Sequence, residues 1–202
     1  MPMQLTCVTR LSDVHKEGII RKLKDAVIAV GRFIASPLRR AKHRKYADPE
    51  AQAHQHIELP NDQLLPLVRK AIAEGHTAII SVKGYSMRPF LEHLRDKVKL
   101  APISNEDLRV GDAVLAEIAK GCFVLHRIIE INGEQLTLQG DGNVRGTETC
   151  TMSDVCGVVI EYIRPGGHVI LASDSGLCRR IKLWRRLRPL RRYLLFFYKL
   201  TI

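Results

Sequence analysis

The sequence has no long apolar run. Its longest candidates, Ala26 to Gly31 and Leu194 to Tyr198, fall far short of the roughly eighteen apolar residues that a membrane-spanning helix needs. The N-terminus also lacks a signal peptide's succession of basic segment, apolar segment and small-residue cleavage site. We therefore expect a cytoplasmic protein, either free or held peripherally on the inner membrane.

Cysteine pairs at metal-binding spacing are also missing. The five cysteines form no C-x-x-C pair, and their odd number leaves at least one thiol unpaired; they stand at positions 7, 122, 150, 156 and 178. Neither a zinc site nor a full disulfide framework is indicated, and a reducing compartment fits best. His54 and His56 have a metal-like spacing but stand in a polar linker, so we expect no metal and no cofactor.

Aromatic residues are scarce at 5% of the chain, whereas basic residues give it a net charge of +11. Residues 1–56 hold eleven Lys and Arg against five Asp and Glu, residues 57–170 hold twelve against fifteen, and residues 171–202 hold nine against one. This division predicts a basic N-terminal extension and linker, a core domain and a basic C-terminal segment with these boundaries. Because no nucleic-acid-binding motif accompanies the charge, nucleic acid is not expected as a partner.

The C-terminal segment, residues 171–202, has the pattern of an amphipathic helix. Its apolar residues recur at intervals of three and four: Leu183, Leu187, Leu190, Leu194 and Phe197. Pro189 should kink or divide this helix. Two placements stay open. The helix can lie on an anionic membrane surface through residues 179–202, with Trp184, Tyr193 and Tyr198 at the interface, or dock its leucine face on the core.

Residues 16–45 make a weaker case for a second basic helix. Apolar residues again follow helical spacing, and residues 39–45 close the segment with a basic cluster. A membrane-surface or partner-facing helix and a disordered basic arm both fit this composition.

The core domain is expected to be mainly β, and α+β overall. Asn61 can cap a helix from about Asp62 to Glu74, with Gly75 as its stop. The segments that follow are short, β-prone and separated by Gly, Asn, Asp and Pro; they are residues 77–83, 97–100, 113–118, 122–131, 135–139 and 155–163. Asn132-Gly133 predicts a hairpin between the fourth and fifth of these segments.

Three short motifs in this core contain residues that could form a serine protease site. Ser86 lies in Gly84-Tyr85-Ser86-Met87-Arg88-Pro89, His126 precedes Arg127, and Asp141 lies in Gly140-Asp141-Gly142-Asn143. A serine hydroxyl needs a base to remove its proton, and an imidazole does this well when a carboxylate fixes its tautomer. The predicted hairpin places the strand of His126 beside the strand that ends before Asp141.

These motifs, in this order and spacing, resemble those of type I signal peptidases and of the LexA-like self-cleaving repressors. The resemblance runs from about Leu59 to about Arg164 and implies a signal-peptidase-like complex β fold, here flanked by basic amphipathic helices. It also implies that His126 is the base, because the endoplasmic-reticulum branch has a histidine followed by arginine. Lys120, the nearest lysine, stands in a predicted turn.

Two site details stay open. The orienting acid is either Asp141, which is slightly preferred, or Glu148, which stands a few residues after the third motif as a second acid does in the endoplasmic-reticulum branch. Gly84 stands where lysine-type signal peptidases often have a serine that helps bind the oxyanion, so backbone N–H groups near Ser86 would fill that role.

The resulting hypothesis is a serine endopeptidase that cleaves a peptide or protein with a leader segment, with small residues beside the cut. Self-cleavage is a further enzymatic option. The alternative is a catalytically silent module that retains the fold and binds a membrane surface or nucleic acid.

Overall fold

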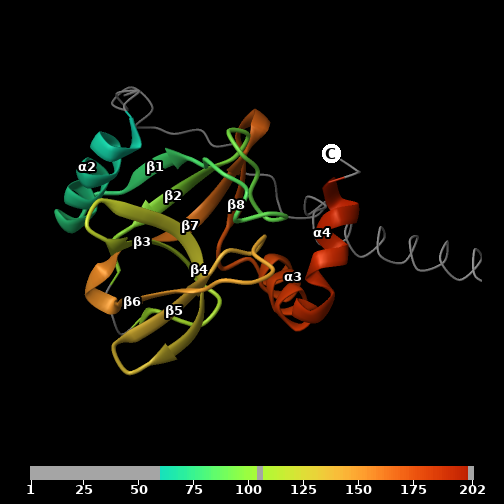
Figure 1. Cartoon of the computed structure of the whole chain (residues 1–202). Coiled ribbons are helices and arrows are strands. Elements are labelled where there is room, and N and C mark those ends of the chain that lie inside the picture. Colours follow the sequence, from blue (N-terminus) through green and yellow to red (C-terminus); the bar gives the residue numbers. More distant parts are fainter. Residues whose placement is uncertain (1–59, 104–106, 200–202) are drawn as a thin grey trace, which may run out of the picture.

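The computed structural model describes residues 60–103 and 107–199. The expected N-terminal basic helix, its linker and the His54–His56 pair lie outside these residues. Eight strands and several helices make up the described part, and every strand pair is antiparallel. The expectation of a mainly β, α+β fold is therefore confirmed (Figure 1).

Helix α2 (Asn61–Ala73) opens the described chain and ends just before Gly75, which has a positive φ of 91°. The sequence predicted Asn61 as the N-cap of this helix, but the N-cap is Pro60. The helix begins at Asn61 itself, and the carbonyl of Pro60 accepts the N–H groups of Gln63 and Leu64. The apolar face of α2 buries Val68 and Ile72 against the sheet.

The strands form one sheet in the order β1-β2-β7-β3-β4-β5-β6, with β8 pairing the C-terminal half of β7. Their bounds are β1 Ala78–Ser81, β2 Lys97–Ala101, β3 Ala113–Ala119, β4 Cys122–Asn132, β5 Gln135–Gln139, β6 Glu148–Thr151, β7 Val155–Arg164 and β8 His168–Leu171. Short 3-10 turns, η2 (Met152–Asp154) and η3 (Pro165–Gly167), flank β7. Strands β6 and β8 were not predicted.

The predicted hairpin is present between β4 and β5. Asn132 pairs with Gln135, and Gly133 takes a positive φ of 58° in the connecting turn. Arg127 pairs with Gln139 at the other end of the same ladder. The hairpin therefore carries the chain from the His126–Arg127 pair directly to the Gly140–Asn143 turn.

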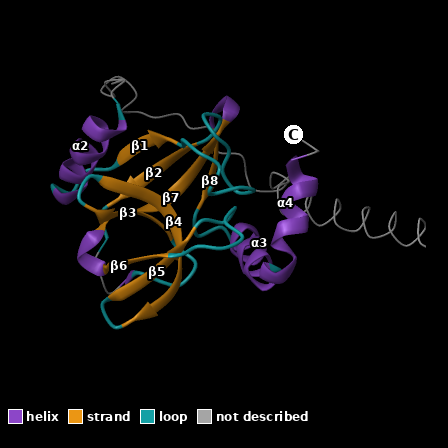
Figure 2. Cartoon of the chain, viewed as in Figure 1, coloured by secondary structure: helices purple, strands orange, loops and turns teal. Residues whose placement is uncertain are grey.

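The C-terminal segment consists of α3 (Ser175–Arg186), the turn η4 (Arg188–Leu190) and α4 (Arg191–Lys199), so Pro189 divides the helix as predicted. Figure 2 shows these helices beside the strands, on the side opposite α2. Leu177, Ile181 and Leu194 belong to the same hydrophobic cluster as Val68 of α2. The C-terminal segment therefore docks on the core domain, which is one of the two placements that the sequence leaves open.

Two of the three aromatic residues that the membrane placement would set at the bilayer interface are instead buried in the core. Trp184 is 1% exposed and its indole N–H donates to the carbonyl of Asp141 at 2.8 Å. Tyr198 is also buried and donates to Glu92 Oε1. Their apolar area stabilises the core rather than facing solvent, whereas Tyr193 stays exposed.

Two hydrophobic clusters lie against the sheet. The first joins α2, β1, β2, the segment after β1, α3 and α4, and the second lies among β3 to β7. Successive side chains of β3 point to opposite faces of the sheet, so Leu115 belongs to the first cluster and Val114 to the second. Among the described residues, no helix is long and apolar enough to cross a bilayer.

Candidate active site

Ser86 lies in the segment that joins β1 to β2, and its position is fixed by its neighbours. Met87, Phe90 and Leu91, which follow it, are each at most 2% exposed and anchor the segment in the first hydrophobic cluster. Ser86 itself is half-buried. Burial of the following residues thus places the partly exposed serine at the edge of a packed core.

The Ser86 segment packs directly on the Gly140–Asn143 turn. The N–H of Gly142 donates to the carbonyl of Ser86 at 2.6 Å. A Cβ at Gly140 would stand 2.5 Å from the Ser86 carbonyl oxygen and 3.0 Å from Ser86 Cβ, and one at Gly142 would stand 2.7 Å from the Tyr85 carbonyl oxygen. Both glycines are therefore needed for this approach of one backbone to another.

His126 makes a close contact with Glu148. Nδ1 of His126, which is 6% exposed, lies 2.9 Å from Oε2 of Glu148. The two residues come from β4 and β6, which the intervening strand β5 holds in register. This arrangement holds the proton on Nδ1 and leaves Nε2 as the basic nitrogen, with no hydrogen-bond partner in the described part of the chain.

Asp141 contacts Arg127 instead. Its carboxylate accepts from Arg127 Nε at 2.9 and 3.0 Å and from Nη2 at 2.6 Å, and Arg127 Nη1 also donates to the Gly111 carbonyl. Burial alone would lower the pKa of the Arg127 guanidinium, but the charges of Asp141 and Tyr162 and the hydrogen bonds to both residues together outweigh burial, and the pKa is raised. The slight preference for Asp141 as the acid beside His126 does not match this geometry, because its charge is matched by Arg127.

Ser86 and His126 come from segments that meet through the hairpin. Ser86 lies against Gly140, Gly140 follows Gln139, and Gln139 pairs with the residue next to His126. No hydrogen bond joins Ser86 to His126 within residues 60–103 and 107–199.

Two of the backbone N–H groups near Ser86 already have acceptors. The N–H of Gly84 donates to His93 Nδ1, and the N–H of Gly142 donates to the Ser86 carbonyl. The N–H of Ser86 has no acceptor among the described residues. It is therefore available to donate to an oxygen that develops charge beside the serine.

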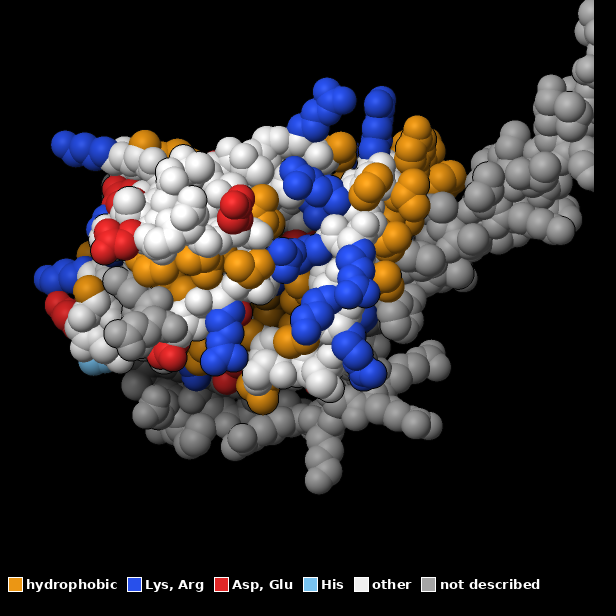
Figure 3. Space-filling model, turned by 90° about the horizontal axis from the view of Figure 1, so that it is seen from below, with side chains coloured by type: hydrophobic (Ala, Val, Ile, Leu, Met, Phe, Trp, Pro, Cys, Tyr) orange, Lys and Arg blue, Asp and Glu red, His pale blue; other side chains and the backbone are white. Residues whose placement is uncertain are grey.

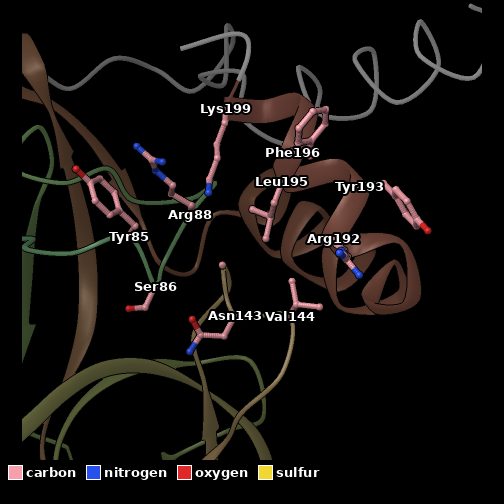
Figure 4. A pocket seen from close by; sticks show the side chains of 11 residues that line it. Tyr85, Ser86, Arg88, Asn143, Val144, Arg192, Tyr193, Leu195, Phe196 and Lys199 are labelled. Carbon is pink, nitrogen blue, oxygen red and sulfur yellow. The ribbon is translucent and has the colours of Figure 1, made fainter.

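A pocket of about 620 Å³ opens beside Ser86, and α4 forms one of its walls (Figure 4). Ser86, Tyr85 and Asn143 lie opposite Tyr193, Leu195 and Phe196. In this view the Ser86 hydroxyl points away from α4. No local sequence pattern predicts this wall, because its residues meet the serine only through the docking of α4.

Lys120, the alternative base, is exposed in the turn between β3 and β4, as predicted. Residues 60–103 and 107–199 contain no group of three or more His, Cys, Asp or Glu arranged to hold a metal ion.

A scan against protein-family models and searches of curated proteins and of solved structures found no significant match to the chain. The chemistry of the site is therefore inferred from its own geometry.

Proposed function

We propose that this protein is a serine endopeptidase with Ser86 as nucleophile, His126 as base and Glu148 as the orienting acid, resembling the histidine-type signal peptidases. The observation that carries the proposal is the 2.9 Å contact between His126 Nδ1 and Glu148 Oε2. The same fold holds Ser86 against Gly140, which directly follows the strand paired with that of His126. An imidazole oriented in this way can act as a general base toward a hydroxyl group within hydrogen-bond reach, and the proposal assigns this role to the Ser86 hydroxyl.

The proposed reaction has two steps. Ser86 Oγ attacks the scissile carbonyl while His126 Nε2 takes the hydroxyl proton, and the same proton then passes to the leaving amine. Water next attacks the acyl-serine, with His126 again acting as base, and releases the second product. Glu148 stabilises the imidazolium that forms in each step, and the Ser86 N–H stabilises the oxyanion.

The substrate class follows from the resemblance. We expect a leader-bearing or exported peptide that binds in extended form, with small side chains beside the cleaved bond. Self-cleavage uses the same groups. The catalytically silent module is the competing hypothesis, and it predicts no turnover from Ser86.

The test is a cleavage assay on a library of leader-type peptides with mass-spectrometric detection. Wild type should cut a subset of the peptides, Ser86→Ala and His126→Ala should cut none, and Ser81→Ala, which changes an exposed serine on β1, should cut as wild type does. Intact mass of the protein itself reports self-cleavage. Cleavage by Ser86→Ala at the wild-type rate, or no cleavage by wild type, would reject the proposal.

A further inference from the structure

A second pocket, of about 450 Å³, lies between the β4–β5 hairpin and the C-terminal helices. Most of its lining side chains are basic: Lys182, Arg185, Arg186, Arg188 and Arg191. Of the described residues that line it, Glu130 is the single acidic one, so the pocket has a strong excess of positive charge. Such a concentration of cations in a concave site attracts an anion.

Within the described residues, the carboxylates form their salt bridges elsewhere. In the described part of the chain, no salt bridge joins any of the five to a carboxylate. Among residues 60–103 and 107–199, Arg185 donates only to the Ile129 carbonyl, at 3.4 Å. The charge of the pocket is therefore available to a ligand.

Arg191 lies at the base of this cluster and is only 2% exposed. Its Nη1 donates to Gln139 Oε1 at 3.1 Å and to the Asn143 carbonyl at 2.8 Å, while its Nε has no hydrogen-bond partner in the described residues. A buried guanidinium with an unused donor costs free energy unless a ligand or a carboxylate satisfies it. Burial also lowers the pKa of Arg191, which a bound anion would reverse.

Exposed apolar side chains accompany the pocket on the same helical segment. Leu190 is 52% exposed, Tyr193 is 61% exposed and Phe196 is 60% exposed. Figure 3 shows Lys and Arg side chains gathered on the face seen from below, with hydrophobic side chains beside them on the α3–α4 side. Basic and apolar groups side by side form the surface that a charged bilayer binds, because one part contacts headgroups and the other enters the interface.

We propose that this pocket binds the phosphate headgroup of an anionic phospholipid, with Leu190, Tyr193 and Phe196 entering the bilayer interface. Arginine forks match phosphate oxygens in pairs, and the cluster supplies several such forks around one concave site. The exposed rings and leucine favour a lipid over a soluble phosphate, which would use only the charged part. This inference is independent of the proposed peptidase activity.

The basic pocket lies close to the candidate active site. Arg191 connects the basic pocket to the Asn143 carbonyl, and the turn that contains Asn143 contacts the Ser86 segment. A headgroup in the pocket would place the Ser86 pocket close to the bilayer surface. Substrates with a membrane-associated leader would then reach the serine from the lipid side.

Vesicle co-sedimentation of the full chain tests the proposal. Wild type should bind vesicles of phosphatidylcholine and phosphatidylglycerol and should not bind vesicles of phosphatidylcholine alone. Lys182→Gln/Arg188→Gln removes two exposed cations of the pocket and should weaken binding roughly thirtyfold. Leu190→Ser should weaken it severalfold at unchanged charge.

The matched control is Lys97→Gln/Lys120→Gln, which removes the same charge from exposed positions outside the pocket. It should weaken binding less than about threefold, because its charges lie outside the lipid contact. An equal loss of vesicle binding in both double variants would overturn the proposed role of the pocket, because net charge alone would then explain the binding. Calorimetry with inorganic phosphate and with a DNA duplex completes the test, because binding of either one without binding of anionic vesicles would overturn the lipid assignment.

Discussion

Nδ1 of His126 and Oε2 of Glu148 lie 2.9 Å apart, across strands that are separated in the sheet by β5. This relationship separates the two acids that the sequence leaves as rivals, because Asp141 is engaged by Arg127. The two carboxylates should therefore respond differently to the same type of substitution.

Glu148→Gln should lower kcat by about 10²- to 10⁴-fold while leaving the protein folded. The amide keeps the shape of the carboxylate but cannot stabilise the imidazolium. Peptide cleavage measured together with thermal unfolding checks this. Glu134→Gln, at an exposed turn position, is the control and should leave kcat unchanged. A Glu148→Gln variant with wild-type kcat would remove Glu148 from the mechanism.

Asp141→Asn should act mainly on stability. Arg127 is 1% exposed, and loss of the partner charge leaves a buried guanidinium unpaired, at a cost of about 3–5 kcal/mol. Arg127→Met/Asp141→Leu should be less destabilised than Asp141→Asn, since it removes both charges. Urea unfolding gives the comparison, and a free energy of unfolding unchanged in Asp141→Asn would contradict the buried pair.

Gly140→Ala should disrupt the site through space alone. The new Cβ would stand 2.5 Å from the Ser86 carbonyl oxygen, so one of the two backbone segments must move. We expect a stability loss of about 1–3 kcal/mol and loss of cleavage. Val144→Ala in the same loop, at a 39% exposed position, should cost less than about 1 kcal/mol. Equal stability of the two variants would show that the segments do not meet.

Trp184→Ala should destabilise the whole described fold by about 3–5 kcal/mol. The ring is buried against Phe90 and donates to the Asp141 carbonyl, so its loss leaves a cavity and an unpaired acceptor. Phe196→Ala, at a 60% exposed position, should change stability by less than about 0.5 kcal/mol. Circular dichroism during urea unfolding measures both, and a small effect of Trp184→Ala would mean that α3 is not part of the core.

The sequence predicted the strands with strong local signals and missed those without them. The β-prone runs bounded by turn residues, together with the Asn132-Gly133 turn, identified β4 and β5 closely. Strand β6 was missed because only Cys150 of its four residues is buried, which leaves no alternation to detect. Strand β8 is equally short and follows two glycines of positive φ, so the segment resembled a loop.

For the site, the sequence predicted the candidate residues but not their pairing. The assignment of Glu148 to His126 depends on the register of β6 against β5, and β6 had not been predicted. Likewise, Trp184 and Tyr198 have the composition of interface rings, and only long-range packing on Asp141 and Glu92 places them in the core. Helical periodicity defines an apolar face but not the surface that covers it.

The proposed mechanism requires that Ser86 becomes acylated, and capture of the acyl-enzyme tests this step. A peptide ester built on a cleaved library sequence is mixed with the protein, the reaction is quenched in acid, and the digest is analysed by mass spectrometry. We predict an acyl adduct on the fragment that contains Ser86, absent from Ser86→Ala and accumulating more slowly in His126→Ala. Peptide cleavage without an adduct on Ser86, or an adduct on another residue, would contradict the account.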